Sequence, residues 1–246
     1  FKQKTAYEIR LSLVGSEMCI RDRHGATHLR GGVFRAGTYP GKSFGWINDR
    51  LIHGFKRAAN VNRLLNIIEV LDYSEESFKF IEDYADCYQV GARSQQNYSL
   101  LKKVGASGKP VFIKRNVGST IDELLGSAEH VLTAQVEAGV KQEVYLIERG
   151  SATQATHVRW DLSISMIPAI KQITDIPVIV DASHGTGRRD LVSSMTLAGV
   201  AAGAGGCLIE VHPDPEKSIS DADQAINYEE YQLLMEKIYK IREVLK

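Results

Sequence analysis

Long apolar runs and an excess of charge of one sign are both missing from this sequence. No run approaches about 18 uninterrupted apolar residues, the length typical of a membrane-spanning helix. The 30 basic and 30 acidic residues give a formal net charge of zero, which offers no electrostatic argument for nucleic acid or an anionic membrane as a partner. Any anion that the protein binds must therefore be held by a local cluster of cations.

Cysteine is scarce as well. The three cysteines, Cys19, Cys87 and Cys207, form no CxxC pair and no spacing that suggests a disulfide framework. The amino-terminal residues contain no apolar core followed by a cleavage site, so they do not resemble a secretory signal. We therefore expect a reduced, soluble, cytoplasmic protein.

Two common phosphate-binding loops, GxGxxG and GxxxxGK[ST], are also absent. The chain instead alternates short β-branched runs with helix-like segments, which predicts parallel βαβ units. The expected strands are 27–34, 64–71, 87–92, 110–115, 143–150, 176–184 and 206–213. The expected helices are 46–60, 74–84, 95–104, 119–138, 163–173, 188–203 and 227–245. In the last helix, the residues expected to pack inward are Tyr228, Leu233, Ile238 and Ile241.

Polar residues follow nearly every expected strand. Because a (β/α)8 barrel assembles its site from the carboxyl ends of many strands, we predict this fold, with residues 24–246 as one catalytic domain. Seven strands are one too few to close such a barrel. Residues 1–23 resemble translated sequencing-adapter DNA, and we expect them to be a non-native leader that stands in place of the native first strand.

Cationic residues gather at the expected strand ends. The group consists of Arg30, Arg35, Arg93, Lys114, Arg115 and Arg149. Around an empty pocket these charges would repel one another, whereas a ligand with phosphate and carboxylate groups would satisfy them. The alternative is an ordinary ion pair for each cation, with Glu69, Glu148 and Asp181 as the partners. That alternative explains any single cation better than it explains all of them together.

A second group of strand-end residues is suited to a metal. His184, Glu210 and Asp221 offer an imidazole and two carboxylates, a mixed set that fits Mn²⁺, Fe²⁺, Co²⁺ or Zn²⁺ with positions left open for a substrate oxygen. The alternative is that His184 is a hydrogen-bonded structural residue, which is common for a single histidine at the end of a strand. His212 competes with His184 for the metal role.

Six segments, taken in order, resemble one family over nearly all of residues 27–245. They are LRGGVFR (29–35), QVGARSQQNYSLLKKVG (89–105), KPVFIKR (109–115), IERG (147–150), IPVIVDASHGTGRRDLV (176–192) and IEVHPDPEKSISDADQ (209–224). Together they resemble the short, β-type class of 3-deoxy-arabino-heptulosonate 7-phosphate (DAHP) synthase, the first enzyme of the shikimate pathway of aromatic amino acid biosynthesis. The resemblance implies a (β/α)8 barrel that condenses phosphoenolpyruvate with erythrose 4-phosphate and releases phosphate. It also implies a divalent metal and a homo-oligomer.

The resemblance assigns roles to individual residues. Arg93, Lys114 and Arg149 would hold the phosphate of phosphoenolpyruvate, and Arg30 with Arg35 would face its carboxylate. The full expected substrate-binding set is Arg30, Arg35, Thr38, Arg93, Lys114, Arg115 and Arg149. The expected catalytic residues are Lys114 and His184, and the expected metal ligands are His184, Glu210 and Asp221, three of the four that the family uses.

Two of the chain's departures from the family pattern concern the binding of the metal and of the acceptor aldose. The fourth metal ligand of the family is a cysteine in a GPCS-like turn, which this sequence lacks, and Cys19 is not expected to replace it. The segment RAGTYP (35–40) stands where the family usually has KPRTSP, so Gly37 replaces a cation that would meet the phosphate of erythrose 4-phosphate. The cations that could compensate are Lys42, Arg188 and Arg189.

Three other interpretations stay open at this level. The first keeps phosphoenolpyruvate but changes the aldose, as in 3-deoxy-octulosonate 8-phosphate and sialic acid synthases, and Gly37 favours it. The second is a non-catalytic paralogue that binds anions, against which the three matched metal ligands count. The third is a phosphate-binding isomerase on the same barrel, which would need no metal triad.

Overall fold

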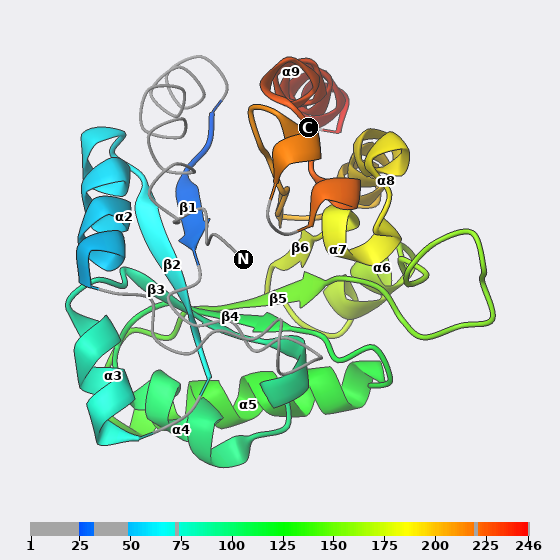
Figure 1. The fold of residues 1–246 in the computed structure, drawn as a ribbon. Helices are drawn as coiled ribbons and strands as arrows, with labels where there is room; N and C mark the ends of the chain where they lie inside the picture. The colour runs from blue at the N-terminus through cyan, green and yellow to red at the C-terminus, as the bar shows by residue number, and fades with distance from the viewer. Residues whose placement is uncertain (1–24, 32–48, 72–73, 219–220, 246) are drawn as a thin grey trace.

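The computed structural model describes residues 25–31, 49–71, 74–218 and 221–245, and a single parallel sheet runs through them (Figure 1). Each strand pairs with the next along the chain, in the order β1 to β7. The strands are β1 (His28–Gly31), β2 (Leu65–Val70), β3 (Cys87–Val90), β4 (Val111–Lys114), β5 (Val144–Glu148), β6 (Val178–Val180) and β7 (Gly206–Cys207). All seven strands expected from the sequence are therefore confirmed, as is their parallel arrangement.

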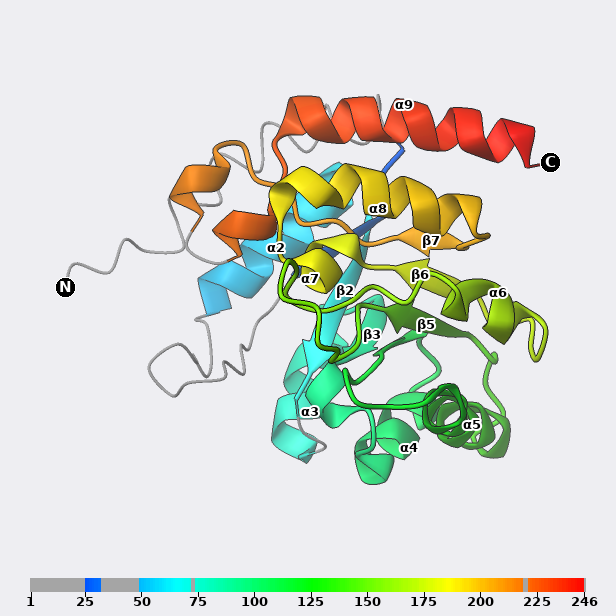
Figure 2. The same cartoon turned by 90° about the vertical axis from the view of Figure 1, so that its right-hand side faces the viewer.

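Helices connect the strands and cover the outside of the sheet (Figures 1 and 2). They are α2 (Asp49–Val61), α3 (Glu75–Glu82), α4 (Tyr98–Ala106), α5 (Ile121–Glu137), α6 (Met166–Lys171), α7 (Ala182–Thr186), α8 (Arg189–Ala201) and α9 (Tyr228–Val244). The described residues also form the short 3-10 turns η2 (Ala92–Ser94), η3 (Pro215–Lys217) and η4 (Ala222–Gln224). No helix of the described segments is long and apolar enough to cross a membrane.

Full closure of a (β/α)8 barrel is not seen. Within the described residues β7 pairs only with β6, and β1 pairs only with β2. The two edges nevertheless approach each other at their carboxyl ends, because Arg30 of β1 makes a 3.0 Å ion pair with Glu210, which follows β7. The observed architecture is a barrel-like parallel α/β sheet, and the expected leader at 1–23 lies outside the described residues.

The observed strands are shorter than predicted, and two of them end several residues early. The run 176–184 leaves the sheet after Val180, because the Asp181 carboxylate accepts a hydrogen bond from the backbone N–H of His184 and begins helix α7. The run 206–213 is a strand only over Gly206–Cys207. Beyond it, the backbone of Glu210 and His212 hydrogen-bonds to Ile226 rather than continuing along β6.

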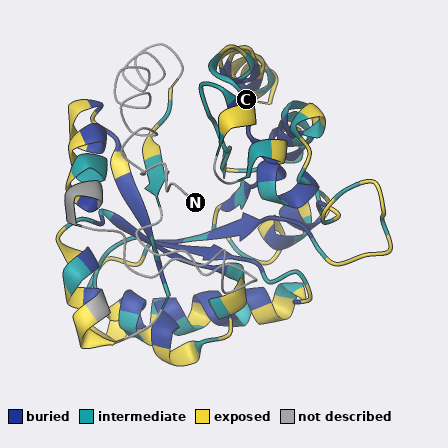
Figure 3. Ribbon diagram, viewed as in Figure 1, coloured by how far each residue is buried: buried dark blue, intermediate teal, exposed yellow. Residues whose placement is uncertain are grey.

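The central strands of the sheet are buried, whereas the edge strands β1 and β7 are partly exposed (Figure 3). Outward residues such as Ile68, Ile113 and Leu146 pack beneath the helices. The inward cluster is formed by Ile67, Cys87, Phe112 and Ile147. Because side chains on a strand alternate between faces, the residues two positions further along point inward as well. These are Glu69, Gln89, Lys114 and Arg149, so a polar layer lies directly above the inner apolar cluster.

Helix α9 packs against α8 (Figure 2), but the prediction that Leu233 belongs to its inner face is wrong. Leu233 is 56% exposed. The buried residues are Tyr231, Leu234, Met235 and Ile238, which follow the 3.6-residue period of a helix stripe. Ile238 is therefore confirmed, and Ile241 packs at the edge of the same cluster.

Candidate active site

Arg30 lies at the centre of a polar network at the carboxyl ends of β1, β2 and β3. Its guanidinium donates to Gln89 Oε1 at 2.9 Å, to Glu210 Oε1 at 3.0 Å and to Glu69 Oε2 at 3.4 Å. Burial acts to lower the pKa of Arg30, but the carboxylates of Glu210 and Glu69 outweigh it and hold that pKa above its ordinary value. Arg30 is thus a fixed cation with carboxylate partners on two sides.

Lys114, Asp181 and His184 form a second cluster, at the ends of β4 and β6. Lys114 Nζ lies 2.9 Å from Asp181 Oδ2, and His184 Nδ1 lies 3.0 Å from Asp181 Oδ1. Asp181 is fully buried, which by itself would raise its pKa, yet His184 and Lys114 together hold that pKa far below its usual range. Asp181 is therefore an ionised anchor for both neighbours.

Lys114 is only 5% exposed, and burial lowers the pKa of its ammonium group despite the attraction of Asp181. Its Nζ also lies 3.4 Å from Nδ1 of His184, so the two residues expected to be catalytic are brought together. Asp181 was not among the site residues expected from the sequence. Its signal was an acidic residue placed directly after the apolar run VIV.

The geometry around His184 fits part of the expected metal set. Its Nδ1 faces the Asp181 carboxylate, which leaves Nε2 directed at Glu210 Oε1, 3.6 Å away. A histidine whose other ring nitrogen is held by a carboxylate is the usual arrangement of a metal ligand. Asp221 is near enough to act electrostatically on the same Arg30. These donors suit a divalent cation, although no group of three or more His, Cys, Asp or Glu with metal-binding geometry occurs in the described parts of the chain.

The described cysteines do not resemble the family's fourth ligand. Burial raises the pKa of Cys87 to about 12 and that of Cys207 to about 11. Cys87 belongs to the inner apolar cluster, and Cys207 packs beneath α8 and α9. Cys19 lies outside the described residues.

Arg149 follows β5 and is a buried cation of a different kind. It is 8% exposed, and its guanidinium makes no hydrogen bond or ion pair with any residue that the structure describes. The guanidinium carbon lies 5.6 Å from the centroid of the Trp160 ring. Burial lowers the pKa of Arg149. The nearby positive charges of Arg159 and Arg93 lower it further, whereas the carboxylate of Asp181 raises it. A buried guanidinium with available donors is a site for an anion.

The guanidinium of Arg115, unlike that of Arg149, is hydrogen-bonded to other groups of the protein. Its Nε and Nη2 donate to the carbonyl of Ser119, and its Nη1 donates to Glu148 Oε2 at 3.1 Å and to Ser151 Oγ at 2.6 Å. The other oxygen of Glu148 accepts from the backbone N–H groups of Gly150 and Ser163. Burial raises the pKa of Glu148, although Arg115 opposes it. Arg115 and Glu148 form an internal pair between the β4 and β5 loops, which differs from the substrate contact expected for Arg115.

The remaining expected residues are spread around the rim or fall outside the description. Arg93 is on η2, exposed, and its charge is felt at Arg149. Arg35 and Thr38, as well as Gly37 and Lys42, lie outside the described residues.

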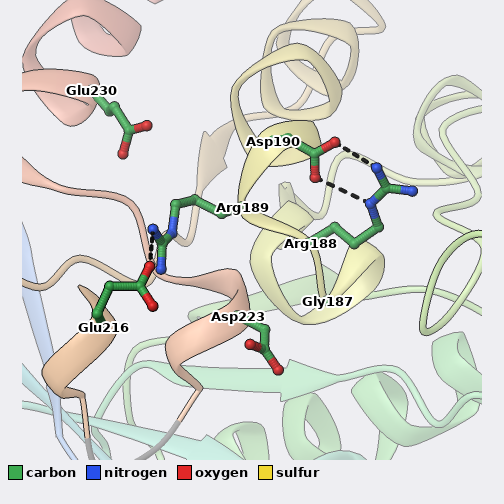
Figure 4. A pocket seen from close by; sticks show the side chains of 7 residues that line it. All are labelled: Gly187, Arg188, Arg189, Asp190, Glu216, Asp223 and Glu230. Carbon is green, nitrogen blue, oxygen red and sulfur yellow. Dashed lines mark hydrogen bonds and ion pairs between the residues drawn. The ribbon is translucent and has the colours of Figure 1, made fainter.

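Arg188 and Arg189, the other possible compensating cations, line an open pocket of about 390 Å³ beside α8 (Figure 4). Arg188 pairs with Asp190, and Arg189 pairs with Glu216 at 2.8 Å. Four acidic residues line the same pocket: Asp190, Glu216, Asp223 and Glu230. Both arginines are therefore already matched by carboxylates at this rim.

Gly150, directly after Arg149, is a position where only glycine fits. Its φ is +98°, and a Cβ there would lie 2.6 Å from Cβ of Trp160 and 3.2 Å from Cα of Gly185. We expect Gly150→Ala to lower the free energy of unfolding by about 1–3 kcal/mol, because strain and overpacking act together. Gly126, inside α5, is the matched control: a Cβ there meets nothing within 4 Å. Gly126→Ala should raise stability by roughly 0.5–1 kcal/mol, and equal effects in chemical denaturation would contradict the argument.

These observations define a class of protein. A barrel-like parallel sheet carries at its carboxyl ends a buried lysine, a histidine–carboxylate pair and a buried arginine that has no acidic partner among the described residues. Enzymes of the barrel class that act on anionic substrates share this arrangement. A sequence profile of the DAHP synthetase I family matches residues 17–246, and the chain belongs to that family.

Individual relatives agree with this assignment. The chain is 36% identical over 239 residues to phospho-2-dehydro-3-deoxyheptonate aldolase of Thermotoga maritima, covering 95% of this chain and 68% of the relative. It is 28% identical over 206 residues to 2-dehydro-3-deoxyphosphooctonate aldolase of Methylibium petroleiphilum, covering 78% of this chain and 71% of that protein.

Solved structures show the same relationship. The crystal structure of the Thermotoga maritima DAHP synthase superposes with a TM-score of 0.86 at 35% identity, over 96% of this chain and 66% of that one. A truncated form of the same synthase gives a TM-score of 0.83 at 33% identity, over 96% and 83% of the two chains. The chain thus spans about two thirds of the full-length Thermotoga enzyme, and the resemblance seen in the sequence is confirmed.

Proposed function

We propose that this protein condenses phosphoenolpyruvate with erythrose 4-phosphate to give DAHP and phosphate, the first step of the shikimate pathway. Membership of the DAHP synthetase I family and the relationship to the Thermotoga maritima enzyme support this reaction. The structural observation that carries it is Arg149, a buried guanidinium without an acidic partner among the described residues. Such a group is stable in its place when a phosphate supplies the missing negative charge.

In this proposal, each cation has a separate task. Arg149 binds the phosphate of phosphoenolpyruvate, with Arg93 at the rim of the same anion site, and Arg30 faces the carboxylate. Holding both ends of the substrate fixes the enol carbon in line with the aldehyde carbon, which removes much of the entropic part of the barrier. Arg115 is assigned to the scaffold, because its donors are used by Ser119, Ser151 and Glu148.

Lys114 is the proposed proton donor. The enol carbon attacks the aldehyde, a carbon–carbon bond forms, and the aldehyde oxygen takes up a proton. Water then adds to the cationic carbon that bears the phosphate and gives up one proton, which restores the ammonium form of Lys114. The carbon–oxygen bond to the phosphate breaks, the hydroxyl proton passes to the leaving phosphate, and a ketone remains. Burial lowers the pKa of Lys114, which makes proton release easier, and Asp181 with His184 fixes the position of its Nζ.

The same proposal includes a divalent metal. His184, Glu210 and Asp221 would hold it, with Asp181 fixing the orientation of the His184 ring. A metal bound there would supply a Lewis acid for the aldehyde. Which of Mn²⁺, Fe²⁺, Co²⁺ or Zn²⁺ is used depends on geometry and availability more than on this set of ligands.

One observation favours an acceptor aldose other than erythrose 4-phosphate. Gly37 removes the expected cation for the phosphate of erythrose 4-phosphate, and the described alternatives, Arg188 and Arg189, are already paired with carboxylates. The relatives named 2-dehydro-3-deoxyphosphooctonate aldolase at 28% identity show that the family's fold also occurs in proteins named for an octulosonate. The alternative product is therefore an eight-carbon or related sugar acid.

The deciding experiment is an assay of Mn²⁺-dependent phosphate release from phosphoenolpyruvate with a panel of aldoses. We expect turnover with erythrose 4-phosphate, and loss of that turnover when the metal is chelated. Turnover only with another aldose would assign the alternative reaction. Tight phosphoenolpyruvate binding without turnover on any aldose would indicate a non-catalytic paralogue. A cytoplasmic location and a homo-oligomer belong to the same proposal, supported by the family alone.

A further inference from the structure

Trp160 is held against the site by the backbone on both sides of it. The backbone N–H of Trp160 donates to the carbonyl of Gly185 in α7 at 2.9 Å, and the backbone N–H of Arg159 donates to the carbonyl of Thr186 at 2.8 Å. On the other side, Asp161 and Ser151 exchange two backbone hydrogen bonds of 2.8 and 3.0 Å. The loop that follows β5 is thus fastened between the end of β5 and the turn that carries His184.

The contact that Trp160 makes is with Arg149. Its ring centroid lies 5.6 Å from the guanidinium carbon, within the range of a cation–π interaction. Its own Nε1 is buried and has no hydrogen-bond partner in the described part of the chain. Gly150 lets the two residues approach, because any side chain there would collide with Cβ of Trp160. The Arg149–Trp160 contact is therefore built into the backbone path.

A competing partner exists for Arg149. The carboxylate of Asp181 attracts it electrostatically, yet no ion pair forms, and Asp181 is instead shared by Lys114 and His184. An ion pair would use the N–H donors of the guanidinium, whereas a ring contact leaves donors available. A tryptophan at this place attracts the cation without occupying those donors.

We propose that Trp160 is a positioning residue that holds the Arg149 guanidinium ready for the phosphate of the substrate. This rests on the proposed function, in that Arg149 is taken as the phosphate ligand. The role concerns substrate binding more than the bond-forming step, because Trp160 acts through Arg149.

The kinetic test compares Trp160→Phe, which keeps an aromatic face, with Trp160→Leu, which keeps bulk but has none. All variants are made in the Trp46→Phe background, so that Trp160 is the single tryptophan of the reference protein. We expect Trp160→Leu to raise KM for phosphoenolpyruvate roughly 3- to 30-fold, and Trp160→Phe to raise it much less. The change in kcat and in KM for the aldose should be smaller, and the Tm values of the two variants should agree.

Fluorescence gives a readout that does not depend on turnover. In the Trp46→Phe protein, titration with phosphoenolpyruvate should change the Trp160 emission, with the midpoint that calorimetry gives for binding. Inorganic phosphate should produce the same change at higher concentration. In the Arg149→Met, Trp46→Phe protein, the change should be lost.

The outcomes separate the two proposals. If phosphoenolpyruvate binds and turns over, but Trp160→Leu leaves KM unaffected and phosphoenolpyruvate leaves the emission of the Trp46→Phe protein unchanged, the positioning role is wrong and the proposed function stands. Equal losses in Trp160→Phe and Trp160→Leu that follow their Tm values would show that Trp160 only packs, and would also overturn it. If calorimetry shows no binding of phosphoenolpyruvate, the proposed function fails and this inference fails with it.

Discussion

Replacing Arg149 with methionine is expected to lower kcat/KM for phosphoenolpyruvate by on the order of 10²- to 10³-fold. Methionine fills a similar volume but cannot bind a phosphate oxygen. The thermal stability of the protein, in contrast to its activity, should not fall. Arg149 is a buried cation without an acidic partner among the described residues, so its removal relieves a desolvation cost and should leave Tm unchanged or raise it.

The measurement pairs steady-state kinetics with thermal unfolding of the same samples. Arg242→Met is the control, because Arg242 is an exposed residue of α9. It should alter neither activity nor Tm. A fall in Tm for Arg149→Met, with an activity loss that follows the unfolded fraction, would show that Arg149 stabilises the fold rather than binding the substrate.

The central strands β3, β4 and β5 could be predicted because they are short apolar runs that are almost entirely buried, and composition carries that information. The residues at which the strands end could not be predicted. The run that includes Val178 continues to His184 by composition, but a side-chain hydrogen bond from the His184 N–H to Asp181 turns the chain into α7. Gly187, in the left-handed region at φ +65°, ends that short helix. Such local bonds compete with the sheet and are not part of β propensity.

The polar layer could be predicted, because period-two alternation places strand-end residues together once the strands are parallel. Which of the cations have an acidic partner could not be predicted. Arg115 and Arg149 both follow apolar strands, yet one pairs with Glu148 and the other has no acidic partner in the described chain. Their difference arises from contacts between separate loops. Trp160 gave no signal at all, because its role depends on a backbone path fixed by Gly150 and α7.

The Arg115–Glu148 pair leads to the second large effect, on stability. We expect Arg115→Met to lower the free energy of unfolding by about 3–5 kcal/mol, the usual consequence of removing one partner from a buried ion pair. Glu148 is fully buried and would be left ionised beside an apolar side chain. Replacing both residues, as in Arg115→Met with Glu148→Gln, should restore a large part of the loss, and a double-mutant cycle measures the coupling.

The pH dependence of Arg115→Met provides an independent check of the same pair. Burial already raises the pKa of Glu148 in the native protein, and losing Arg115, the charged group that opposes this, should raise it further. Between the ordinary pKa of a glutamate and this raised value, the folded state binds more protons than the unfolded state. Stability must therefore fall as pH rises through that window and recover as pH falls below it. Urea unfolding of the variant across this range should show that slope, whereas the double variant should lack it. A variant whose stability is independent of pH would mean that Arg115 does not control the ionisation of Glu148, and would contradict the assignment of this pair to the scaffold.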